Sequence, residues 1–242
     1  MDEASETYYQ SLKTAENAVE YLRSRALSGA NVQYFRLGYV ESPLTGHEKY
    51  AGKLCIPYVT RSGVVSLRFR AIPERNPDHQ PETDPLLDTV YTGHLPELDA
   101  EIDEQFPEQS EWLPIAGPKY MSMPGDMHRM FNTRDLDRRE SFVCITEGEF
   151  DAMAAHQAGL PAVAVPGVNG WSSWWARCFK GYEAVYILCD NDDKGQGAAF
   201  GDKIAAQVSN SRVVLMPPGH DVNSFVIAEG PEALAAKIGG KP

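Results

Sequence analysis

The sequence has no long hydrophobic run and no paired cysteines. No stretch of 18 or more apolar residues occurs in the 242 residues, so the sequence predicts no membrane-spanning helix. The cysteines Cys55, Cys144, Cys178 and Cys189 form no CxxC pair, so no zinc site is expected. Three of them lie in or beside apolar runs, as reduced cysteines that act as small buried hydrophobes do. With the acidic, polar start MDEASETYYQ, which is not a secretory signal, this predicts a cytoplasmic protein.

Positive charge is also scarce. The 22 Lys and Arg stand against 34 Asp and Glu, giving a net charge of −12, which at first argues against a nucleic-acid-binding protein. However, residues 74–111 contain 12 of the acidic residues and one arginine, so the rest of the chain is nearly neutral. This Pro-rich segment is interpreted as a partly disordered acidic insertion; an alternative is that it occupies a basic groove and competes with DNA. Net charge therefore excludes no nucleic-acid function.

The second half of the chain is regular. Short apolar runs predict strands at 142–146, 162–165, 184–189 and 212–216, with helical stretches between them. This alternation is typical of α/β proteins with a mostly parallel sheet flanked by helices. Because the crossovers are right-handed, the C-terminal ends of all these strands are expected at one edge of the sheet.

The first half predicts a smaller mixed α+β subdomain. Residues 14–35 have the spacing of two short helices, and residues 53–59 and 64–70 are expected to pair as a hairpin. The predicted domains are this subdomain, over residues 1–139, and a catalytic domain with a short C-terminal helix, over residues 140–242.

Four acidic residues follow the ends of predicted strands. They are Glu147, Asp190, Asp192 and Asp221. Neighbouring carboxylates repel each other unless a cation lies between them, and Mg²⁺ or Mn²⁺ suits carboxylates that share a site with phosphate oxygens. Solvated turn acids are the alternative, but these would be scattered over both edges of the sheet. The pattern predicts a divalent-metal site in the crevice where open α/β sheets bind ligands.

The segment EGEFDA (147–152), with DND (190–192) after a later strand, resembles the Toprim pattern found in primases, topoisomerases and some nucleases. Four weaker motifs, in the right order, resemble the polymerase core of bacterial-type DnaG primases. They are YLRSRALS with VQYFRLGYV (21–40), KLCIPYV with VVSLRFR (53–70), GPKYMSMP (117–124) and MPPGHDVNSFV (216–226). The resemblance covers most of the chain outside residues 74–111.

Two residues depart from the family pattern. Ser122 stands where the family has Asn, and Asn223 stands where it has a second Asp, which is expected to weaken one metal position. The family's zinc-binding module and helicase-interacting domain have no counterpart in this sequence, so a separate zinc-binding module and a replicative helicase are candidate partners. The compact layout resembles a phage- or plasmid-type minimal primase, or one half of a split primase.

The resemblance implies a DNA-directed RNA polymerase that makes short RNA primers on single-stranded DNA from ribonucleoside triphosphates. No membrane partner is expected. Asp190 and Asp192 are expected to bind Mg²⁺ or Mn²⁺, with Asp221 assisting. Glu147 is expected to act as a metal ligand or as the base that takes the hydroxyl proton. Asp151 falls one helical turn after Glu147 and is a supporting residue; the alternative is an acid that merely favours a helix N-terminus.

Six residues are expected to contact nucleotide or DNA: Arg68, Arg70, Lys119, Tyr120, Arg129 and Lys194. The first two share one strand face and suit phosphates, while Lys119 and Tyr120 pair a charge with a stacking ring. The alternatives are a solvated sheet face for the two arginines, a core-packing role for Lys119 and Tyr120, and a solvated linker for the basic stretch that contains Arg129.

Three tryptophans, Trp171, Trp174 and Trp175, are interpreted as packing a helix onto the sheet, in the core or at an interface, with stacking on bases as the alternative. Glu149 is interpreted as a solvated neighbour of Glu147. Two other functions stay open. A Toprim metal-dependent nuclease would cleave DNA without nucleotides. A non-catalytic single-strand-binding subunit of a split primase would not need the intact acidic set.

Overall fold

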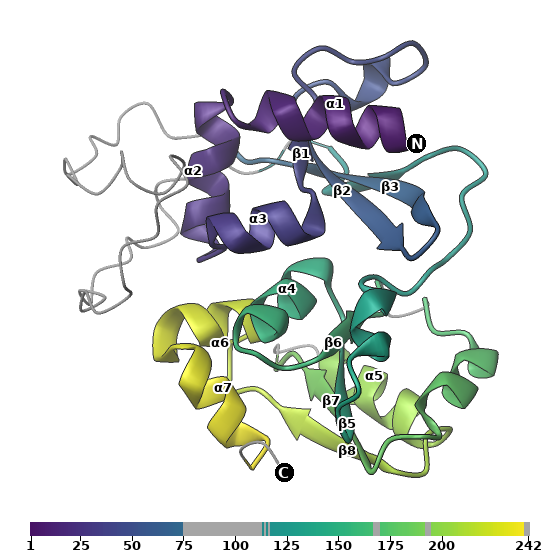
Figure 1. Cartoon of the computed structure of the whole chain (residues 1–242). Coiled ribbons are helices and arrows are strands. Elements are labelled where there is room, and N and C mark those ends of the chain that lie inside the picture. The colour runs from purple at the N-terminus through teal and green to yellow at the C-terminus, as the bar shows by residue number, and fades with distance from the viewer. Residues whose placement is uncertain (75–112, 114, 116, 167–169, 192–194, 240–242) are drawn as a thin grey trace. The chain divides into compact units, whose positions relative to one another are not determined.

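The computed structural model describes residues 1–74, 113, 115, 117–166, 170–191 and 195–239 (Figure 1). The predicted acidic insertion, beyond its first residue Glu74, lies outside the described residues, and so do the predicted site residues Asp192 and Lys194. No described helix is long and apolar enough to cross a lipid bilayer.

The chain forms two compact units. The first contains Met1–Ser24, Ser28–Pro57 and Ser66–Pro124. The second contains Arg25–Leu27, Tyr58–Val65 and Gly125–Pro242. The short central segments show that the chain passes between the units more than once, whereas the sequence predicted a single division between residues 139 and 140. That domain boundary stays a prediction.

The first unit has three helices, α1 (Asp2–Leu12), α2 (Glu16–Ser24) and α3 (Gly29–Phe35). The two helices predicted within residues 14–35 are confirmed, and the side chain of Ser28 caps α3 by accepting a hydrogen bond from the Asn31 amide at 3.3 Å. Helix α1 was not predicted. It packs closely on the following strand at Gly38, where an added Cβ would lie 2.6 Å from the Tyr8 backbone.

A four-stranded sheet completes the first unit. Its order is β1-β2-β3-β4, and its strands are β1 (Gly38–Tyr39), β2 (Lys53–Thr60), β3 (Gly63–Ala71) and β4 (Tyr120–Ser122). A short 3₁₀-helix, η1 (Glu48–Tyr50), lies between β1 and β2. The predicted hairpin is therefore confirmed, and its tip, Tyr58–Val65, belongs to the second unit.

The second unit is built on a parallel sheet of order β6-β5-β7-β8. The strands are β5 (Phe142–Thr146), β6 (Ala162–Ala164), β7 (Ala184–Cys189) and β8 (Ser211–Leu215). The helices are α4 (Glu149–Gln157), α5 (Gln196–Ala205), α6 (Val222–Glu229) and α7 (Pro231–Lys237), with 3₁₀-helices η4 (Thr133–Asp137) and η5 (Ser173–Phe179). The predicted α/β class, with a parallel sheet flanked by helices, is confirmed. Helix α6 was not predicted.

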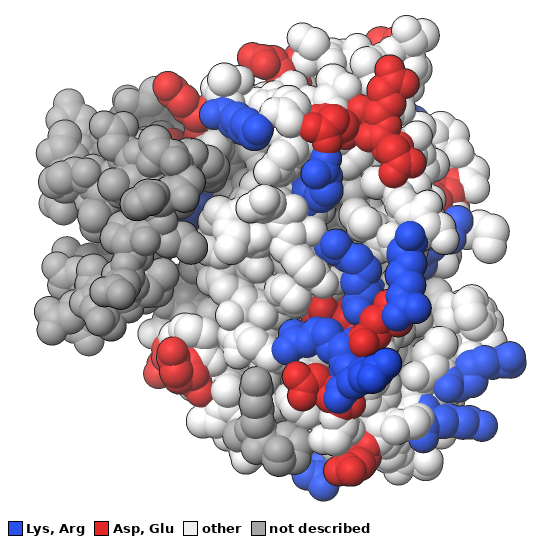
Figure 2. All heavy atoms as spheres, viewed as in Figure 1, with Lys and Arg blue, Asp and Glu red and all other residues white. Residues whose placement is uncertain are grey.

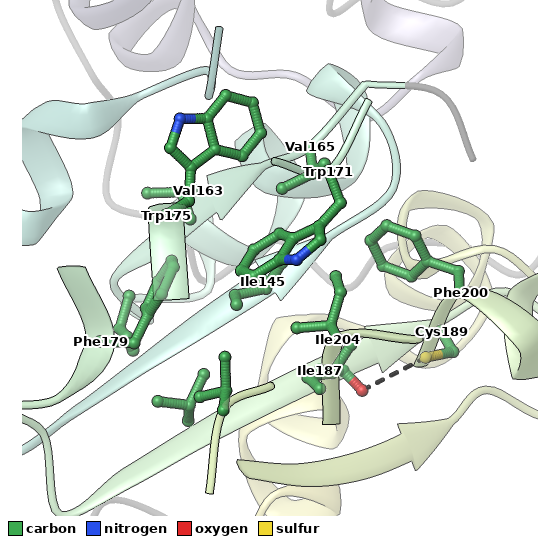
Figure 3. Packing of buried hydrophobic residues seen from close by; sticks show 13 residues of the cluster. Ile145, Val163, Val165, Trp171, Trp175, Phe179, Ile187, Cys189, Phe200 and Ile204 are labelled. Carbon is green, nitrogen blue, oxygen red and sulfur yellow. Dashed lines mark hydrogen bonds between the residues drawn. The ribbon is translucent and has the colours of Figure 1, made fainter. Parts of the chain in front are cut away.

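A hydrophobic cluster fills one side of this sheet (Figure 3). Ile145 and Ile187 contribute from the two central strands, and Trp171, Trp175 and Phe179 contribute from η5 and the residues before it. The predicted packing role is confirmed for the two buried tryptophans. Three of the four cysteines, Cys55, Cys144 and Cys189, are buried as predicted, and Cys178 is exposed.

Candidate active site

Three predicted carboxylates follow strands β5, β7 and β8. Glu147 comes directly after β5 and Asp190 directly after β7. Since these two strands are parallel neighbours, both residues lie at the same edge of the sheet. Asp221 comes after the loop that follows β8 and is the N-cap residue of α6. These acids therefore lie at the edge formed by the C-terminal ends of the strands, as the strand order predicted.

Backbone hydrogen bonds join the loops that follow β7 and β8. The Asn191 amide donates to the carbonyl oxygen of His220 at 3.0 Å, and the Gly219 amide donates to the carbonyl oxygen of Asn191 at 2.8 Å. Asn191 is the residue after Asp190, and His220 is the residue before Asp221. This reciprocal pairing fixes the two loops to each other and so holds both acids at one place.

Helix α5 also restrains Asp190. It begins beside the Asp190 backbone, and a Cβ added to Gly197 would lie 2.0 Å from the Asp190 carbonyl oxygen. No side chain fits in that space. The glycine therefore allows the first turn of α5 to pack against the end of β7, and this contact sets the path of the chain that carries Asp190.

Asp151 is a buried carboxylate in the first turn of α4, with 6% of its surface exposed. One of its oxygens, Oδ1, accepts a hydrogen bond from the Asn223 amide at 3.1 Å. Burial raises the pKa of Asp151 well above its ordinary value, and the negative charges of Asp221 and Asp190 raise the pKa further. These three carboxylates therefore share one electrostatic environment, as the predicted crevice requires.

Glu147 lies close enough to Asp190 for both charges to affect the same group, the thiol of Cys189. Burial raises the pKa of the Cys189 thiol to about 12, and the charges of Glu147, Asp190 and Asp202 add to the effect. The thiol at the end of β7 thus senses both Glu147 and Asp190. Of the five acids predicted for the site, the four that are described gather at this edge. Asp192, the fifth, lies outside the described residues.

Asp221 has structural partners that the sequence did not reveal. Its Oδ1 accepts a hydrogen bond from the Ser224 amide at 2.6 Å, and its own amide donates to Ser224 Oγ at 2.9 Å, which forms a capping box. Its Oδ2 lies 3.7 Å from Nη2 of Arg25. Asp221 therefore begins a helix and forms an ion pair as well as facing the other acids.

Two further residues of this region, Arg25 and Asn223, were not predicted as site residues. The Arg25 guanidinium lies 5.4 Å from the centre of the Phe150 ring, and its carbonyl oxygen accepts from Asn223 Nδ2 at 2.9 Å. Asn223 had been noticed only as a departure from the family pattern. Arg25 lies in the quoted segment YLRSRALS, but nothing in that segment points to its partners, because they are far away in the sequence and only the fold brings them together.

The prediction for Glu149 is wrong. Its side chain is 1% exposed rather than solvated, and its Oε1 accepts a hydrogen bond from the Tyr58 hydroxyl at 2.8 Å. The reason is that α4 begins at Glu149, so this residue faces inward with the first turn of the helix. From the sequence we expect this helix over residues 151–158, so its predicted start lies two residues later.

The donor chemistry of this edge fits a hard divalent cation. Within the described part of the chain, no three His, Cys, Asp or Glu side chains are already arranged to hold a metal ion. The charged groups that act on Asp151 nevertheless include the carboxylates of Asp221 and Asp190, and carboxylates are the ligands that Mg²⁺ and Mn²⁺ prefer. A bound cation would reduce the electrostatic repulsion between them.

A second set of predicted residues lies in the first unit, around the ring of Tyr120. The guanidinium carbons of Arg68 and Arg70 lie 4.6 Å and 4.9 Å from the centre of this ring, and Arg70 also donates a hydrogen bond to the Tyr120 hydroxyl. Arg70 is only 5% exposed, so the alternative of a solvated sheet face is wrong for this residue. Burial lowers the pKa of Arg70, but Tyr120 and Tyr21 outweigh it and raise the pKa overall, so the charge is kept.

Two further predicted binding residues, Lys119 and Arg129, are exposed. Lys119 precedes Tyr120 in the first unit. Arg129, in the second unit, has its Nε 3.7 Å from Oδ1 of Asp126. Figure 2 shows Lys and Arg side chains gathered on the visible face, with Asp and Glu side chains among them. The acidic net charge therefore does not make every surface acidic.

Comparison with known proteins agrees with this geometry. Residues 144–226 match the Toprim-like family. The chain is 44% identical over 121 residues to the Gene 57 protein of Mycobacterium phage D29, an alignment that covers 50% of this chain and 78% of that protein. It is 27% identical over 263 residues to a DNA primase of Pseudomonas putida, covering 98% of this chain but only 37% of that primase.

A solved structure shows the same fold. The RNA polymerase domain of the Mycobacterium tuberculosis primase DnaG superposes with a TM-score of 0.65 at 20% identity, covering 98% of this chain and 80% of that structure. The match extends over both compact units, so the fold likeness is not limited to the Toprim-like part. The chain therefore belongs to one family with the phage D29 Gene 57 protein, carries a Toprim-like domain and has the fold of the DnaG primase catalytic core.

Proposed function

We propose that this chain is the catalytic core of a DNA primase, a DNA-directed RNA polymerase that makes short RNA primers on single-stranded DNA for replication. The observation that carries the proposal is the convergence of Glu147, Asp190 and Asp221 at one edge of a Toprim-like sheet, with the buried Asp151 beside them. The primase relatives support the proposal, although the chain spans 37% of the length of the Pseudomonas putida protein.

The proposed reaction is nucleotidyl transfer. The 3′-hydroxyl oxygen of the growing primer bonds to the α-phosphorus of a ribonucleoside triphosphate, and the bond from that phosphorus to the bridging oxygen breaks, which releases pyrophosphate. The hydroxyl proton passes to a base, and we assign this role to Glu147 because it lies directly after β5 and is only partly buried. Catalysis of this kind depends on positioning and on neutralising phosphate charge.

A divalent cation, Mg²⁺ or Mn²⁺, would supply the neutralising charge when bound. Asp190 and Asp192 are proposed as its principal ligands, with Glu147 and Asp221 contributing. Asp221 is held by its capping box with Ser224 and by Arg25, so its carboxylate is oriented before any ligand arrives. Asp151 is proposed to support the metal ligands indirectly. It accepts a hydrogen bond from the amide of Asn223, which lies two residues after Asp221.

Arg68 and Tyr120 are proposed to bind nucleotide or template through charge and ring stacking, together with Lys119. Arg70 has a different proposed role. Because it is buried and bonded to the Tyr120 hydroxyl, it orients that ring and does not itself reach a phosphate. Arg129 and Lys194 remain proposed phosphate contacts, and a zinc-binding module and a helicase remain proposed partners.

The test is primer synthesis on single-stranded DNA with labelled ribonucleotides and Mg²⁺ or Mn²⁺. The variants Glu147→Gln, Asp190→Asn and Asp192→Asn should abolish product while the chain stays folded by circular dichroism. Lys203→Gln, an exposed residue near the end of α5, is the matched control and should keep full activity. Wild-type product that persists in the Glu147 and Asp190 variants would overturn the assignment of the site.

Assays on the same purified protein distinguish the two other functions. A Toprim nuclease would cut the template with metal and no nucleotides, and the cut would disappear in the same variants. A non-catalytic subunit would bind single-stranded DNA without making or cutting a chain, and would stay inactive after a zinc-binding partner protein is added. Synthesis that appears only with this partner would instead indicate one half of a split primase.

A further inference from the structure

Trp174 is the residue that departs most from its predicted role. It was expected to pack with the other two tryptophans in the core or at an interface, yet 58% of its surface is exposed, whereas Trp171 and Trp175 are 7% and 2% exposed. Tryptophan is enriched where proteins bind other molecules, because its ring combines a large apolar face with a polar N–H. The carboxylate edge and the Tyr120 set make no use of this residue.

The exposed ring is held in place from below. Its centroid lies 5.6 Å from that of Trp175, with 68° between the two planes, so the contact is edge to face. Trp175 is in turn packed edge to face against Trp171 at 6.0 Å, inside the hydrophobic cluster (Figure 3). An edge contact with a buried neighbour orients the Trp174 ring and leaves much of its face open to solvent.

Two cations share the exposed side of the same short helix. Trp174, Arg177 and Lys180 are spaced three residues apart, and η5 is a 3₁₀-helix with Lys180 as its C-cap residue. Side chains three apart are eclipsed in a 3₁₀-helix, and all three residues are exposed. They form one stripe, called here the η5 stripe: a ring followed by two positive charges.

One acidic residue close to η5, Asp137, is already ion-paired. Asp137 contributes to the raised pKa of Tyr182, as Cys178 of η5 does, so it lies in the same neighbourhood. Its Oδ2 accepts from Nε of Arg61 at 2.7 Å, which offsets its charge. The η5 stripe itself carries two positive charges, from Arg177 and Lys180, beside an exposed aromatic ring.

We infer that the η5 stripe is a binding site for single-stranded nucleic acid, in which an unpaired base stacks on Trp174 and Arg177 and Lys180 contact the flanking phosphates. A ring with adjoining cations is the combination by which proteins hold single strands without sequence preference. Protein interfaces are also enriched in tryptophan and arginine, but they are depleted in lysine, which the η5 stripe contains. The inference rests on the proposed function, since it adds a template contact to the primase core.

The test measures binding of a fluorescein-labelled thymidine oligonucleotide to the full chain, without nucleotides or metal. Trp174→Ala should weaken binding about 5- to 150-fold, the range for loss of one base–aromatic stack, and Trp174→Phe should restore part of it. Arg177→Gln with Lys180→Gln should lower the salt dependence, by roughly 0.7 in slope for each phosphate contact removed.

Two control variants come from the same unit. Met127→Ala removes a side chain that is 72% exposed and carries no ring, and Lys203→Gln removes an exposed charge outside the η5 stripe. Both should bind as the wild type does. If Trp174→Ala binds the oligonucleotide as tightly as these controls, the inference is wrong. If the variant also converts a dimer to a monomer in sedimentation velocity, the stripe is a self-association surface instead.

The oligonucleotide-binding test and the primer-synthesis test can give opposite results, so the further inference and the proposed function can be rejected independently. A chain that makes no primers but loses oligonucleotide affinity in Trp174→Ala keeps this inference and loses the proposed function. A chain that makes primers and shows no effect of Trp174→Ala keeps the proposed function and loses this inference.

Discussion

The hydroxyl of Tyr58 donates a 2.8 Å hydrogen bond to Oε1 of Glu149, a carboxylate that is 1% exposed. Glu149 is the first residue of α4 and lies two residues after Glu147, while Tyr58 lies near the end of β2. The Tyr58 ring is also packed edge to face against Phe131 at 5.3 Å. The start of the helix that follows the proposed catalytic base is thus fixed by a side chain from a distant strand.

Removing this donor should destabilise the second unit. Tyr58→Phe leaves a buried carboxylate oxygen without its tyrosine donor, and a hydrogen bond to a charged group contributes about 1.5–3 kcal/mol. The free energy of unfolding, measured in urea, should fall by about that amount. Primer synthesis should fall as well, with a change in turnover larger than the change in nucleotide affinity, because the residue acts on the position of Glu147.

Tyr182→Phe is the matched control for this change. Its hydroxyl donates to the Leu136 carbonyl oxygen at 3.1 Å, which is a neutral acceptor in a half-buried setting. Its loss should cost only about 0.5–1.5 kcal/mol. Equal costs for the two variants would show that Glu149 gains nothing special from Tyr58, and Tyr58→Phe combined with Glu149→Gln should recover part of the loss.

A methyl group at Gly197 should disrupt the end of β7. Gly197→Ala places a Cβ 2.0 Å from the Asp190 carbonyl oxygen, so either α5 or the Asp190 loop must move. We expect loss of activity together with a lower melting temperature. Gly181→Ala is the control, since no atom lies within 4 Å of the added Cβ and the backbone there has no positive φ. Wild-type activity in Gly197→Ala would contradict the tight packing described here.

Local patterns predicted the elements and the edge of the sheet, but not the contacts made across the fold. The strands β5, β6, β7 and β8 were found because short apolar runs and alternating helices are written in consecutive residues. The same order placed Glu147, Asp190 and Asp221 at one edge.

What the sequence could not predict depends on distant partners. Arg25 meets Asp221 only after folding, and the burial of Glu149 depends on Tyr58. Trp174 and Trp175 are adjacent residues of the same type, yet one is buried and the other exposed, because η5 is a 3₁₀-helix whose packing turns them to different sides. Composition and spacing alone do not distinguish such neighbours.

The stability of the first unit should depend on pH through His47. Its Nδ1 lies 2.7 Å from the Tyr8 hydroxyl, which also accepts a hydrogen bond from the Leu44 amide at 3.1 Å. The imidazole and the hydroxyl therefore share one hydrogen bond inside a fixed loop. Burial lowers the pKa of His47 below 6.5, and the N-terminal charge lowers it further, against an opposing effect of Glu48.

The sign follows from proton binding. Below pH 6.5 the unfolded chain protonates His47 while the folded chain does not, so the stabilising contribution is full above pH 6.5 and is lost as pH falls to the folded pKa. Urea unfolding at pH 7.5 and 5.5 should show a smaller pH dependence in His47→Gln than in the wild type. Replacing the exposed His128 by Gln should leave the dependence unchanged. An identical pH dependence in all three proteins would exclude His47 as its source.

Removing a charge from the carboxylate edge should stabilise the chain when no metal is present. Asp151 is buried beside the negative charges of Asp221 and Asp190, and all of these raise its pKa. Asp151→Asn removes the repulsion at neutral pH and keeps an oxygen that can accept from the Asn223 amide. In EDTA the variant should unfold at a higher temperature than the wild type, by an amount equivalent to about 1–3 kcal/mol.

Adding Mg²⁺ should raise the melting temperature of the wild type more than that of the variant, because the cation relieves the same repulsion. Glu232→Gln, an acid in the first turn of α7, is the matched control and should respond to EDTA and Mg²⁺ as the wild type does. A variant that is less stable than the wild type in EDTA would mean that the Asp151 charge is compensated by its surroundings and that the acids at this edge do not need a cation.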